Sequence, residues 1–307
     1  MAIAVHSIGV HLAENTIDNL ARAEELGVTR EFIERKVGFE QLRRRGSEET
    51  VVSMCCAAAE DLLAKSPIDL GQIDFVSVCT HHPDMYIPHM SARVHGALKL
   101  SKDCATYDVG LACSGYVYSL VMAKSFMEAQ GLKHGLVFTS DPYSDAVDQT
   151  TRNEDIFASD AATVTYLAED GVFDIGRGTF HTFGEMGDAL IHTHDDYLRM
   201  DGFGIYTFAL RNVPPNIEEC LKANGLEQED VDCFVLHQAN KYIVDCLQKR
   251  MKLRPEACPF LANRHGNTSS STIPIELCRF FESNENNLML TGFGAGLSIA
   301  SVPLRRK

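Results

Sequence analysis

The sequence contains no tryptophan, few basic residues for its length and no long hydrophobic run. Its 28 lysines and arginines face 42 aspartates and glutamates, which gives a formal net charge of -14. Such a charge repels nucleic acid and anionic membranes at long range. No apolar run approaches the roughly 20 residues that cross a bilayer, and the first residues lack the basic and apolar regions of a signal peptide. We therefore expect a cytoplasmic protein without nucleic-acid or membrane partners.

Zinc-ligand spacings are also missing, although the chain has ten cysteines and two clusters of histidine and aspartate, at 81–84 and 192–196. Neither cluster has a partner at an established zinc spacing, so we predict no metal site. Cysteines in a chain without a secretion signal are expected to be reduced thiols. Most should be small apolar core residues, and one is a candidate for a reactive thiol.

The chain is long enough, at 307 residues with 45% hydrophobic content, for one large domain or two fused halves. Short β-rich runs alternate with helical patterns, which predicts an α/β architecture with largely parallel strand pairing. A division into residues 1–168 and 169–307 gives two α/β halves, although the sequence does not prove a duplication. The predicted strands are 74–80, 106–109, 135–140, 163–167, 233–236 and 287–291, and the predicted helices are 50–64, 114–130, 215–224 and 241–252.

The most informative stretch contains Cys113, which lies where a β-like run breaks at small residues and a helix follows at once. The positive end of a helix favours a thiolate, and a thiolate attacks thioester carbonyls. The alternative is a buried structural cysteine, because cysteine is commonly buried.

Two further segments carry candidate polar groups. His237 follows an apolar run and precedes a new helix, and the carboxyl end of a strand is where open α/β sheets place ligand-handling groups. Asn267 lies in a polar turn that leads into an apolar helix. Taken singly, the histidine reads as a core residue and the asparagine as part of a capping turn.

Together, these segments resemble the β-ketoacyl-[acyl-carrier-protein] synthase III branch of the thiolase superfamily, over nearly the whole chain. The family's Ala-Cys-x-Gly motif matches residues 112–115, its His-Gln-Ala-Asn matches 237–240, and its Gly-Asn-Thr-Ser matches 266–269. Three motifs in the same order and at similar separations are highly specific. The resemblance implies a five-layered αβαβα thiolase fold built from two similar halves, and a homodimer.

The resemblance implies a mechanism in two halves. Cys113 first takes an acyl group from a coenzyme A or acyl-carrier-protein thioester. His237 and Asn267 then bind the carbonyl of malonyl-carrier protein, which loses CO₂, and the resulting carbanion attacks the acyl-cysteine to give a 3-oxoacyl thioester. The family's oxyanion hole corresponds to the backbone N–H groups of Cys113 and Ala295, in the turn 292–296. No metal or resident cofactor is required.

Two other functions remain open. The same cysteine can pass its acyl group to an oxygen or nitrogen acceptor instead of a malonyl carbanion. Alternatively, the chain can be a non-catalytic partner subunit of a heteromeric synthase. The second alternative is disfavoured, because a subunit freed from chemistry needs no cysteine, histidine and asparagine together.

Several positions depart from the family pattern. Relatives stack the adenine of coenzyme A between a tryptophan and an arginine, and these positions correspond to Phe32 and Arg152; Asn240 completes the implied substrate contacts. Phenylalanine offers less stacking area, so a carrier protein could replace coenzyme A as the donor. The family's glycine-rich Phe-Gly-Asp-Gly-Ala-Gly segment has lost its glycines at 158–163, which makes that backbone less permissive.

The helix after His237 carries basic residues that are expected to dock an acidic carrier protein, among them Lys241, Lys249 and Arg250. A solvated helix face is the alternative, and the family's docking arginine falls at Tyr242. The resemblance further implies that Ile87 reaches across the dimer interface and closes the acyl pocket of the partner subunit. Since relatives with phenylalanine there accept short primers, we predict a preference for primers longer or more branched than acetyl.

Overall fold

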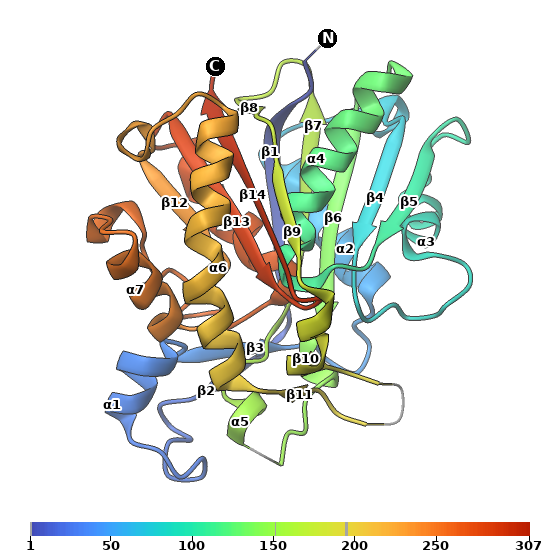
Figure 1. Ribbon diagram of the computed structural model, residues 1–307. Helices are drawn as coiled ribbons and strands as arrows, with labels where there is room; N and C mark the ends of the chain where they lie inside the picture. The colour runs from blue at the N-terminus through green and yellow to red at the C-terminus, as the bar shows by residue number, and fades with distance from the viewer. Residues whose placement is uncertain (1, 151, 194–195) are drawn as a thin grey trace.

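A ten-stranded mixed sheet runs through the computed structural model, which describes residues 2–150, 152–193 and 196–307 (Figure 1). The strands follow the order β12-β13-β14-β8-β1-β7-β6-β4-β5, and β9 pairs with β14. Their bounds are Ala4–Leu12 (β1), Phe75–Cys79 (β4), Ala105–Val109 (β5), Gly135–Pro142 (β6), Asp160–Ala168 (β7), Phe173–Ile175 (β8), Thr179–Thr182 (β9), Cys233–Leu236 (β12), Asn287–Gly294 (β13) and Ser298–Arg306 (β14).

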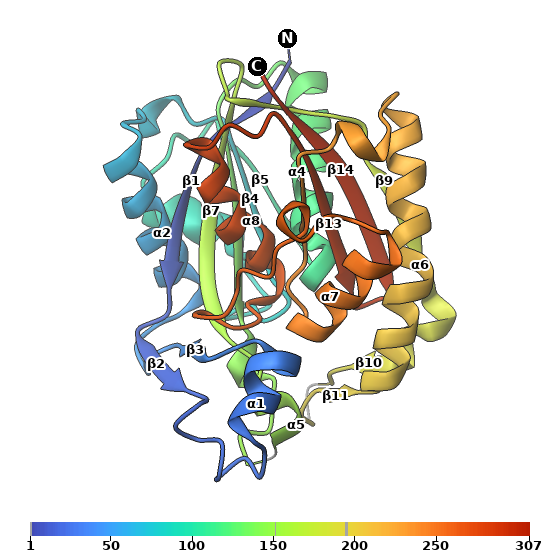
Figure 2. The ribbon, with the colours of Figure 1, turned by 90° about the vertical axis from the view of Figure 1, so that its left-hand side faces the viewer.

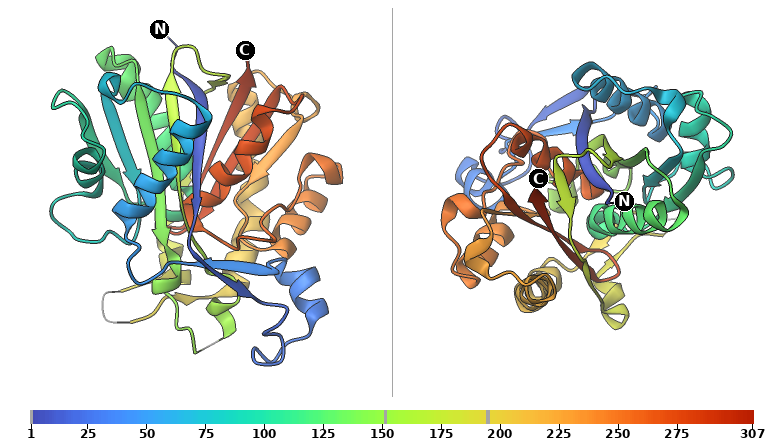
Figure 3. Two further views of the ribbon diagram at one scale, coloured as in Figure 1. Left: turned by 180° about the vertical axis from the view of Figure 1, so that it is seen from behind. Right: turned by 90° about the horizontal axis from the view of Figure 1, so that it is seen from above.

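The helices form three layers around the two halves of this sheet. Their bounds are Arg30–Phe32 (α1), Val51–Lys65 (α2), Met90–Ala97 (α3), Ala112–Gln130 (α4), Arg152–Asp155 (α5), Gly202–Ala223 (α6), Lys241–Arg250 (α7) and Thr272–Leu277 (α8). Seen from behind, α2 lies against β1 and β7 (Figure 3). α6 packs on β13 and β14 at the opposite side, while α4 contacts strands of both halves and lies between them with α8 (Figure 2). This is the five-layered αβαβα arrangement that the sequence predicted.

Local sequence explains how the main layers form. Thr50 and Ser53 exchange side-chain and backbone hydrogen bonds in a capping box at the start of α2, which satisfies two backbone donors of its first turn. Gly131 ends α4 with a φ of 71°, a conformation that glycine adopts at little cost. A Cβ at Gly9 of β1 would lie 2.1 Å from the carbonyl oxygen of Ala58. Only glycine therefore allows α2 to pack so closely on β1.

Two predictions about the fold were wrong. Strand pairing is mixed: β4 pairs in parallel with β5 and β6, and β12 with β13, but β7 pairs antiparallel with β1 and β6, and β14 with β13. The predicted helix 215–224 is the second half of α6, which begins at Gly202 after an Asp201 cap and continues through Pro214 and Pro215. Proline favours the first turn of a helix, so the sequence suggested a start there. The division at 168/169 stays a prediction.

Smaller elements gather at the end of the molecule opposite the two termini (Figure 1). They are α1, α5 and two short antiparallel pairs, β2 (Asn15–Asp18) with β3 (Gln41–Arg44) and β10 (Leu190–Ile191) with β11 (Arg199–Met200). At this end α4 begins, and β12 and β13 reach their carboxyl ends. None of the helices described is both long and apolar enough to cross a membrane.

Candidate active site

Cys113 lies at the start of α4, next to the turn that follows β13. The backbone turns sharply here, since Ala112 has a φ of 42°, and the Cys113 side chain is buried. A Cβ at Gly294 would lie 2.9 Å from the Cβ of Cys113, so glycine is needed for this approach. Ala295 and Gly296 line the same cavity as Cys113, which brings the two predicted oxyanion-hole positions to one place.

Ser269 connects all three predicted catalytic residues. Its Oγ lies 3.8 Å from the Sγ of Cys113, and its backbone N–H donates to Oδ1 of Asn267 at 2.9 Å. Its carbonyl oxygen accepts a hydrogen bond of 3.1 Å from the hydroxyl of Thr272, which in turn lies 2.7 Å from Nδ1 of His237. The structure thus brings Cys113, His237 and Asn267 together, as the sequence predicted.

The hydrogen bond to Asn267 fixes the direction of its amide. Oδ1 must face the N–H of Ser269, because an N–H donates only to an acceptor. The amide NH₂ of Asn267 is then left as a donor. Asn267 is buried and held by its backbone, which bonds to Phe157 and Ser159 at 2.9 and 3.0 Å. It therefore presents a fixed donor for a carbonyl oxygen.

His237 can present either a base or a donor. Its buried ring packs edge-on against Phe293. The hydroxyl of Thr272 has a single hydrogen, which it gives either to Ser269 or to Nδ1 of His237. In the first case the proton of the neutral imidazole is on Nδ1 and Nε2 has a free lone pair; in the second Nε2 carries the proton. Burial lowers the pKa of His237 to about 3, so the ring is neutral near pH 7.

The protonation state of Cys113 differs from the one predicted. Burial raises the pKa of its thiol to about 12; the hydrogen bond with Ser269 lowers this pKa, and the buried charge of Asp141 raises it. We expected the end of α4 to favour a thiolate, but loss of solvation outweighs the helix end. The resting site holds a neutral thiol and a neutral imidazole.

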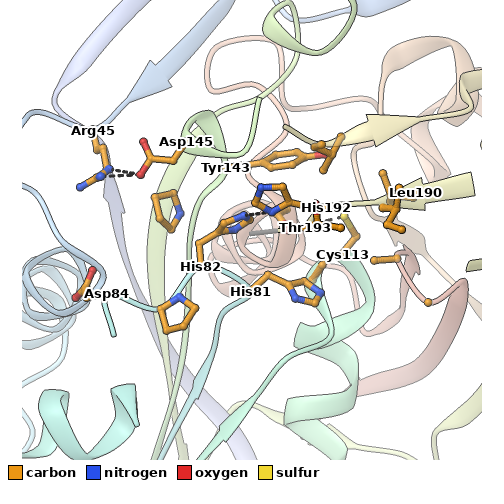
Figure 4. Close-up of a pocket in the computed structure, with 18 of the residues that line it drawn as sticks. Arg45, His81, His82, Asp84, Cys113, Tyr143, Asp145, Leu190, His192 and Thr193 are labelled. Carbon is orange, nitrogen blue, oxygen red and sulfur yellow. Dashed lines mark hydrogen bonds and ion pairs between the residues drawn. The ribbon is translucent and has the colours of Figure 1, made fainter. Parts of the chain in front are cut away.

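A cavity of about 850 Å³ opens beside Cys113 (Figure 4). Ser269, Ala295 and Gly296 line it on the side of the turn, and Tyr143 lies next to them. His237 and Asn267 are not among its lining residues. Of these three residues, Cys113 alone lines this cavity.

Comparison with known proteins gives the family. Models of 3-oxoacyl-[acyl-carrier-protein] synthase III and of its C-terminal region match residues 107–184 and 221–306. The β-ketoacyl-[acyl-carrier-protein] synthase III of Streptococcus sanguinis is 30% identical, over 96% of both chains. The chain belongs to the synthase III family. It is thus a condensing enzyme of the acyltransferase class.

Solved structures of synthase III enzymes share its fold. A crystal structure of a 3-oxoacyl-(acyl-carrier-protein) synthase III matches with a TM-score of 0.93 and 30% identity, over 99% of this chain and 100% of the other. The priming β-ketosynthase of the R1128 polyketide pathway matches with a TM-score of 0.91 and 26% identity, over 100% and 97%. The predicted thiolase fold is confirmed.

Two of the residues expected to contact coenzyme A, Phe32 and Asn240, are not among those that line this cavity. Phe32 ends the short helix α1 and is 45% exposed. Arg152 begins α5, and its side chain lies outside the described part of the structure. Asn240 caps α7, where its Oδ1 accepts from the N–H of Ile243 at 2.8 Å. The contacts of these three residues with substrate stay predictions.

The segment without the family's glycines is regular in this structure. Residues 160–163 belong to β7, an extended strand that does not need glycine. Ser159 instead exchanges hydrogen bonds of 2.6 and 2.9 Å with the backbone of Arg43, and a Cβ at Gly266 would lie 2.7 Å from the Cβ of Ser159. The less permissive backbone is therefore compatible with the conformation that this segment adopts in β7.

The basic residues of α7 lie at its two ends. Lys241 is at the first position and pairs with Asp245 at 3.2 Å. Lys249 and Arg250 are exposed in the last turn, roughly 12 Å further along the axis, where they also suit the negative end of the helix. Lys36, which the sequence did not single out, places its Nζ 3.9 Å from the ring centre of Tyr242.

Sequence reasoning also missed Thr272 and Tyr143. Thr272 lies three residues after Ser269, at a spacing that brings its hydroxyl back to the carbonyl of Ser269. A threonine at this spacing in the predicted helix was the signal that could have identified it. Tyr143 directly follows β6 in the polar stretch 139–145, and only the fold shows that it lines the same cavity as Cys113 (Figure 4).

Proposed function

We propose that this enzyme condenses an acyl thioester with malonyl-acyl-carrier protein, releasing CO₂ and forming a 3-oxoacyl thioester through an acyl intermediate on Cys113. The observation that carries this proposal is the hydrogen-bonded path through Ser269, which joins Cys113, His237 and Asn267. Membership in the synthase III family supports the same chemistry.

In the first half-reaction, the neutral thiol needs a base. Nε2 of His237 accepts the proton of Cys113 as the sulfur bonds to the thioester carbonyl carbon. The backbone N–H groups of Cys113 and Ala295 stabilise the oxyanion. The bond to the donor sulfur then breaks, and the departing thiolate takes from His237 the proton that Cys113 had given. Thr272 supports this step by accepting the hydrogen of Nδ1.

In the second half-reaction, His237 and Asn267 act as donors. With the Thr272 hydroxyl turned towards Nδ1, Nε2 carries a proton and bonds the malonyl thioester carbonyl together with the amide of Asn267. Loss of CO₂ leaves an enolate that these two donors stabilise. Its carbon attacks acyl-Cys113, the carbon–sulfur bond breaks, and the departing cysteine thiolate takes up one proton from water. Both reactants arrive as thioesters, so the reaction requires no resident cofactor or metal.

The carrier docks, in this proposal, near the start of α7. Lys241 lies there, and Lys36 places a cation over Tyr242, the position of the family's docking arginine. Cations suit an acidic carrier protein. Phe32, Arg152 and Asn240 are proposed to contact the coenzyme A or carrier arm.

We further propose a homodimer in the cytoplasm. The loop before α3 exposes Tyr86 by 74% and Ile87 by 88%, and large apolar side chains at a loop tip suit an interface. Ile87 then closes the acyl pocket of the partner subunit. The ten cysteines are all free thiols, which supports a reducing compartment.

The test combines intact mass with CO₂ release. Wild type should gain an acyl adduct from a thioester donor and release labelled CO₂ from malonyl-carrier protein, whereas Cys113→Ala should gain no adduct. Cys79→Ala, at another buried cysteine, is the matched control. An adduct without CO₂ release would favour transfer to an oxygen or nitrogen acceptor, and no adduct at all would favour a non-catalytic subunit.

A further inference from the structure

The cavity beside Cys113 has several polar side chains in its wall, although it is the space that we expect to receive the acyl chain. Beyond the nucleophile it is lined by charged and hydrogen-bonding side chains as well as by Leu190, Ile191 and Leu198. Small-molecule pockets are ordinarily lined by apolar groups with few polar ones. The polar members include Arg45, His81, His82, Asp84, Tyr143, Asp145 and His192.

The charged groups of this wall are already paired within the protein. Nε and Nη2 of Arg45 lie 2.9 and 2.6 Å from Asp145. Asp84 accepts hydrogen bonds of 2.8 and 3.2 Å from the backbone at the start of α2. Asp141, below the wall, accepts from the N–H of His81 at 2.7 Å and from the hydroxyl of Ser270 at 2.6 Å. In the part of the chain that the structure describes, these charged groups thus already have partners within the protein.

Neutral hydrogen-bonding groups remain for a ligand. Among the residues that the structure describes, the Tyr143 hydroxyl has no hydrogen-bond partner in the protein, although the side chain is only 7% exposed. Burial raises the pKa of Tyr143, and so does the nearby Cys113, which agrees with a neutral phenol beside the nucleophile. Nε2 of His82 lies 3.2 Å from Nδ1 of His192, and both residues line the cavity (Figure 4). Burial lowers the pKa of His82, which favours its neutral form.

A hydrocarbon chain would remove water from the Tyr143 hydroxyl without replacing its hydrogen bond, which disfavours binding. A hydroxyl on the chain would replace it, because it can both donate and accept. Sites that hydrogen-bond a substrate hydroxyl reject analogues that lack it much more strongly than apolar sites reject an extra methylene. The polar wall therefore suits a chain with one neutral polar substituent.

We infer that the acyl group carried by Cys113 bears a hydroxyl, and that Tyr143 is the residue that selects it. This inference rests on the proposed function, since it assigns the primer of the same acyl-transfer step. The His82–His192 pair lines the same cavity and limits where the substituent can lie. The predicted preference for primers larger than acetyl is compatible with this assignment.

The test uses pairs of coenzyme A thioesters that differ by one hydroxyl-to-methyl exchange: 3-hydroxybutyryl against isovaleryl, and 4-hydroxybutyryl against pentanoyl. The kcat/KM of adduct formation on Cys113 is followed by intact mass. Wild type should favour the hydroxylated member of at least one pair by about tenfold or more. Tyr143→Phe should reduce that ratio to about one and retain reaction with the hydrocarbon member.

The matched control is Tyr166→Phe. Tyr166 lies on β7, its hydroxyl is 2.7 Å from Nδ1 of His134, and it is not among the residues that line the cavity. Its hydroxyl preference should equal that of wild type. The inference is overturned if the hydrocarbon member reacts equally well or better in both pairs, or if the preference survives Tyr143→Phe. If an adduct still forms in those outcomes and labelled CO₂ is still released from malonyl-carrier protein, the proposed function stands. No adduct from any donor overturns both.

Discussion

Thr272→Val removes the one hydroxyl that contacts Nδ1 of His237 while keeping the shape of the side chain. The change leaves Nδ1 in a buried, apolar setting. A buried N–H without a partner is less tolerated than a buried acceptor, so the imidazole proton should move to Nε2. His237 then keeps its donor for the malonyl carbonyl but loses the lone pair that accepts the proton of Cys113.

The expected effect follows from the cost of a buried group without its partner, about 1–3 kcal/mol, which corresponds to roughly 5- to 150-fold. Acyl transfer should therefore slow by about one to two orders of magnitude. Release of CO₂ from malonyl-carrier protein by pre-acylated enzyme should change much less. Thr272→Ser keeps the hydroxyl and should restore most of the acyl-transfer rate.

Single-turnover experiments measure the two half-reactions separately. Adduct formation on Cys113 is followed by quenched intact mass, and decarboxylation by labelled CO₂ from enzyme that already carries its acyl group. Equal slowing of both steps would indicate a general loss of packing around Thr272. Unchanged acyl transfer would remove Thr272 and the Nε2 base from the mechanism.

Four further results are expected. Asn267→Ala should still acylate Cys113 but fail to release CO₂ from malonyl thioester, and normal CO₂ release would remove Asn267 from the mechanism. Alkylation of Cys113 by iodoacetamide should rise about tenfold per pH unit from pH 6 to 9, because the thiol pKa is about 12 and only the thiolate reacts; a plateau near neutral pH would contradict a neutral resting pair. Ile87→Phe should shift kcat/KM from larger primers towards acetyl, at about 0.8 kcal/mol for each methylene excluded, and an unchanged preference would refute its place in the pocket. Lys36→Glu should raise the KM for malonyl-carrier protein and leave kcat intact. The control Lys222→Glu, on α6, should change neither value.

Elements with local signals were predictable from the sequence. The capping box of α2, the glycine after α4 and the apolar runs of β4 and β12 each specify their own structure. Pairing direction was not predictable in the same way, because a fully buried strand such as β7 reads as an apolar run whether its neighbours are parallel or antiparallel. α6 was predicted to begin too late because its prolines favour a helix start over a helix interior.

The three proposed catalytic positions were predicted because each lies in a contiguous motif, whereas the contact that joins Cys113 to Ser269, and so to the other two, spans 156 positions. Tyr143 was not predictable, because the sequence around it says nothing about the direction of its hydroxyl. Sequence order thus points to the proposed reacting groups, and the fold shows the hydrogen bonds that fix the orientation of Asn267 and place the Thr272 hydroxyl against Nδ1 of His237.

The protonation state of Cys113 shows why such a site cannot be derived from a motif alone. A helix N-terminus stabilises an adjacent negative charge by typically 0.3–1 kcal/mol, and by about 2 kcal/mol at most. Burial acts in the opposite direction and raises the pKa of the thiol from 9.0 to about 12, which corresponds to about 4 kcal/mol. Desolvation therefore outweighs the helix end, and in the proposed mechanism the thiol stays neutral until His237 takes its proton as the sulfur attacks a thioester carbonyl. The enzyme then avoids a standing thiolate, which is the form that oxidants attack, and Cys113 reacts fastest in the complex with a thioester.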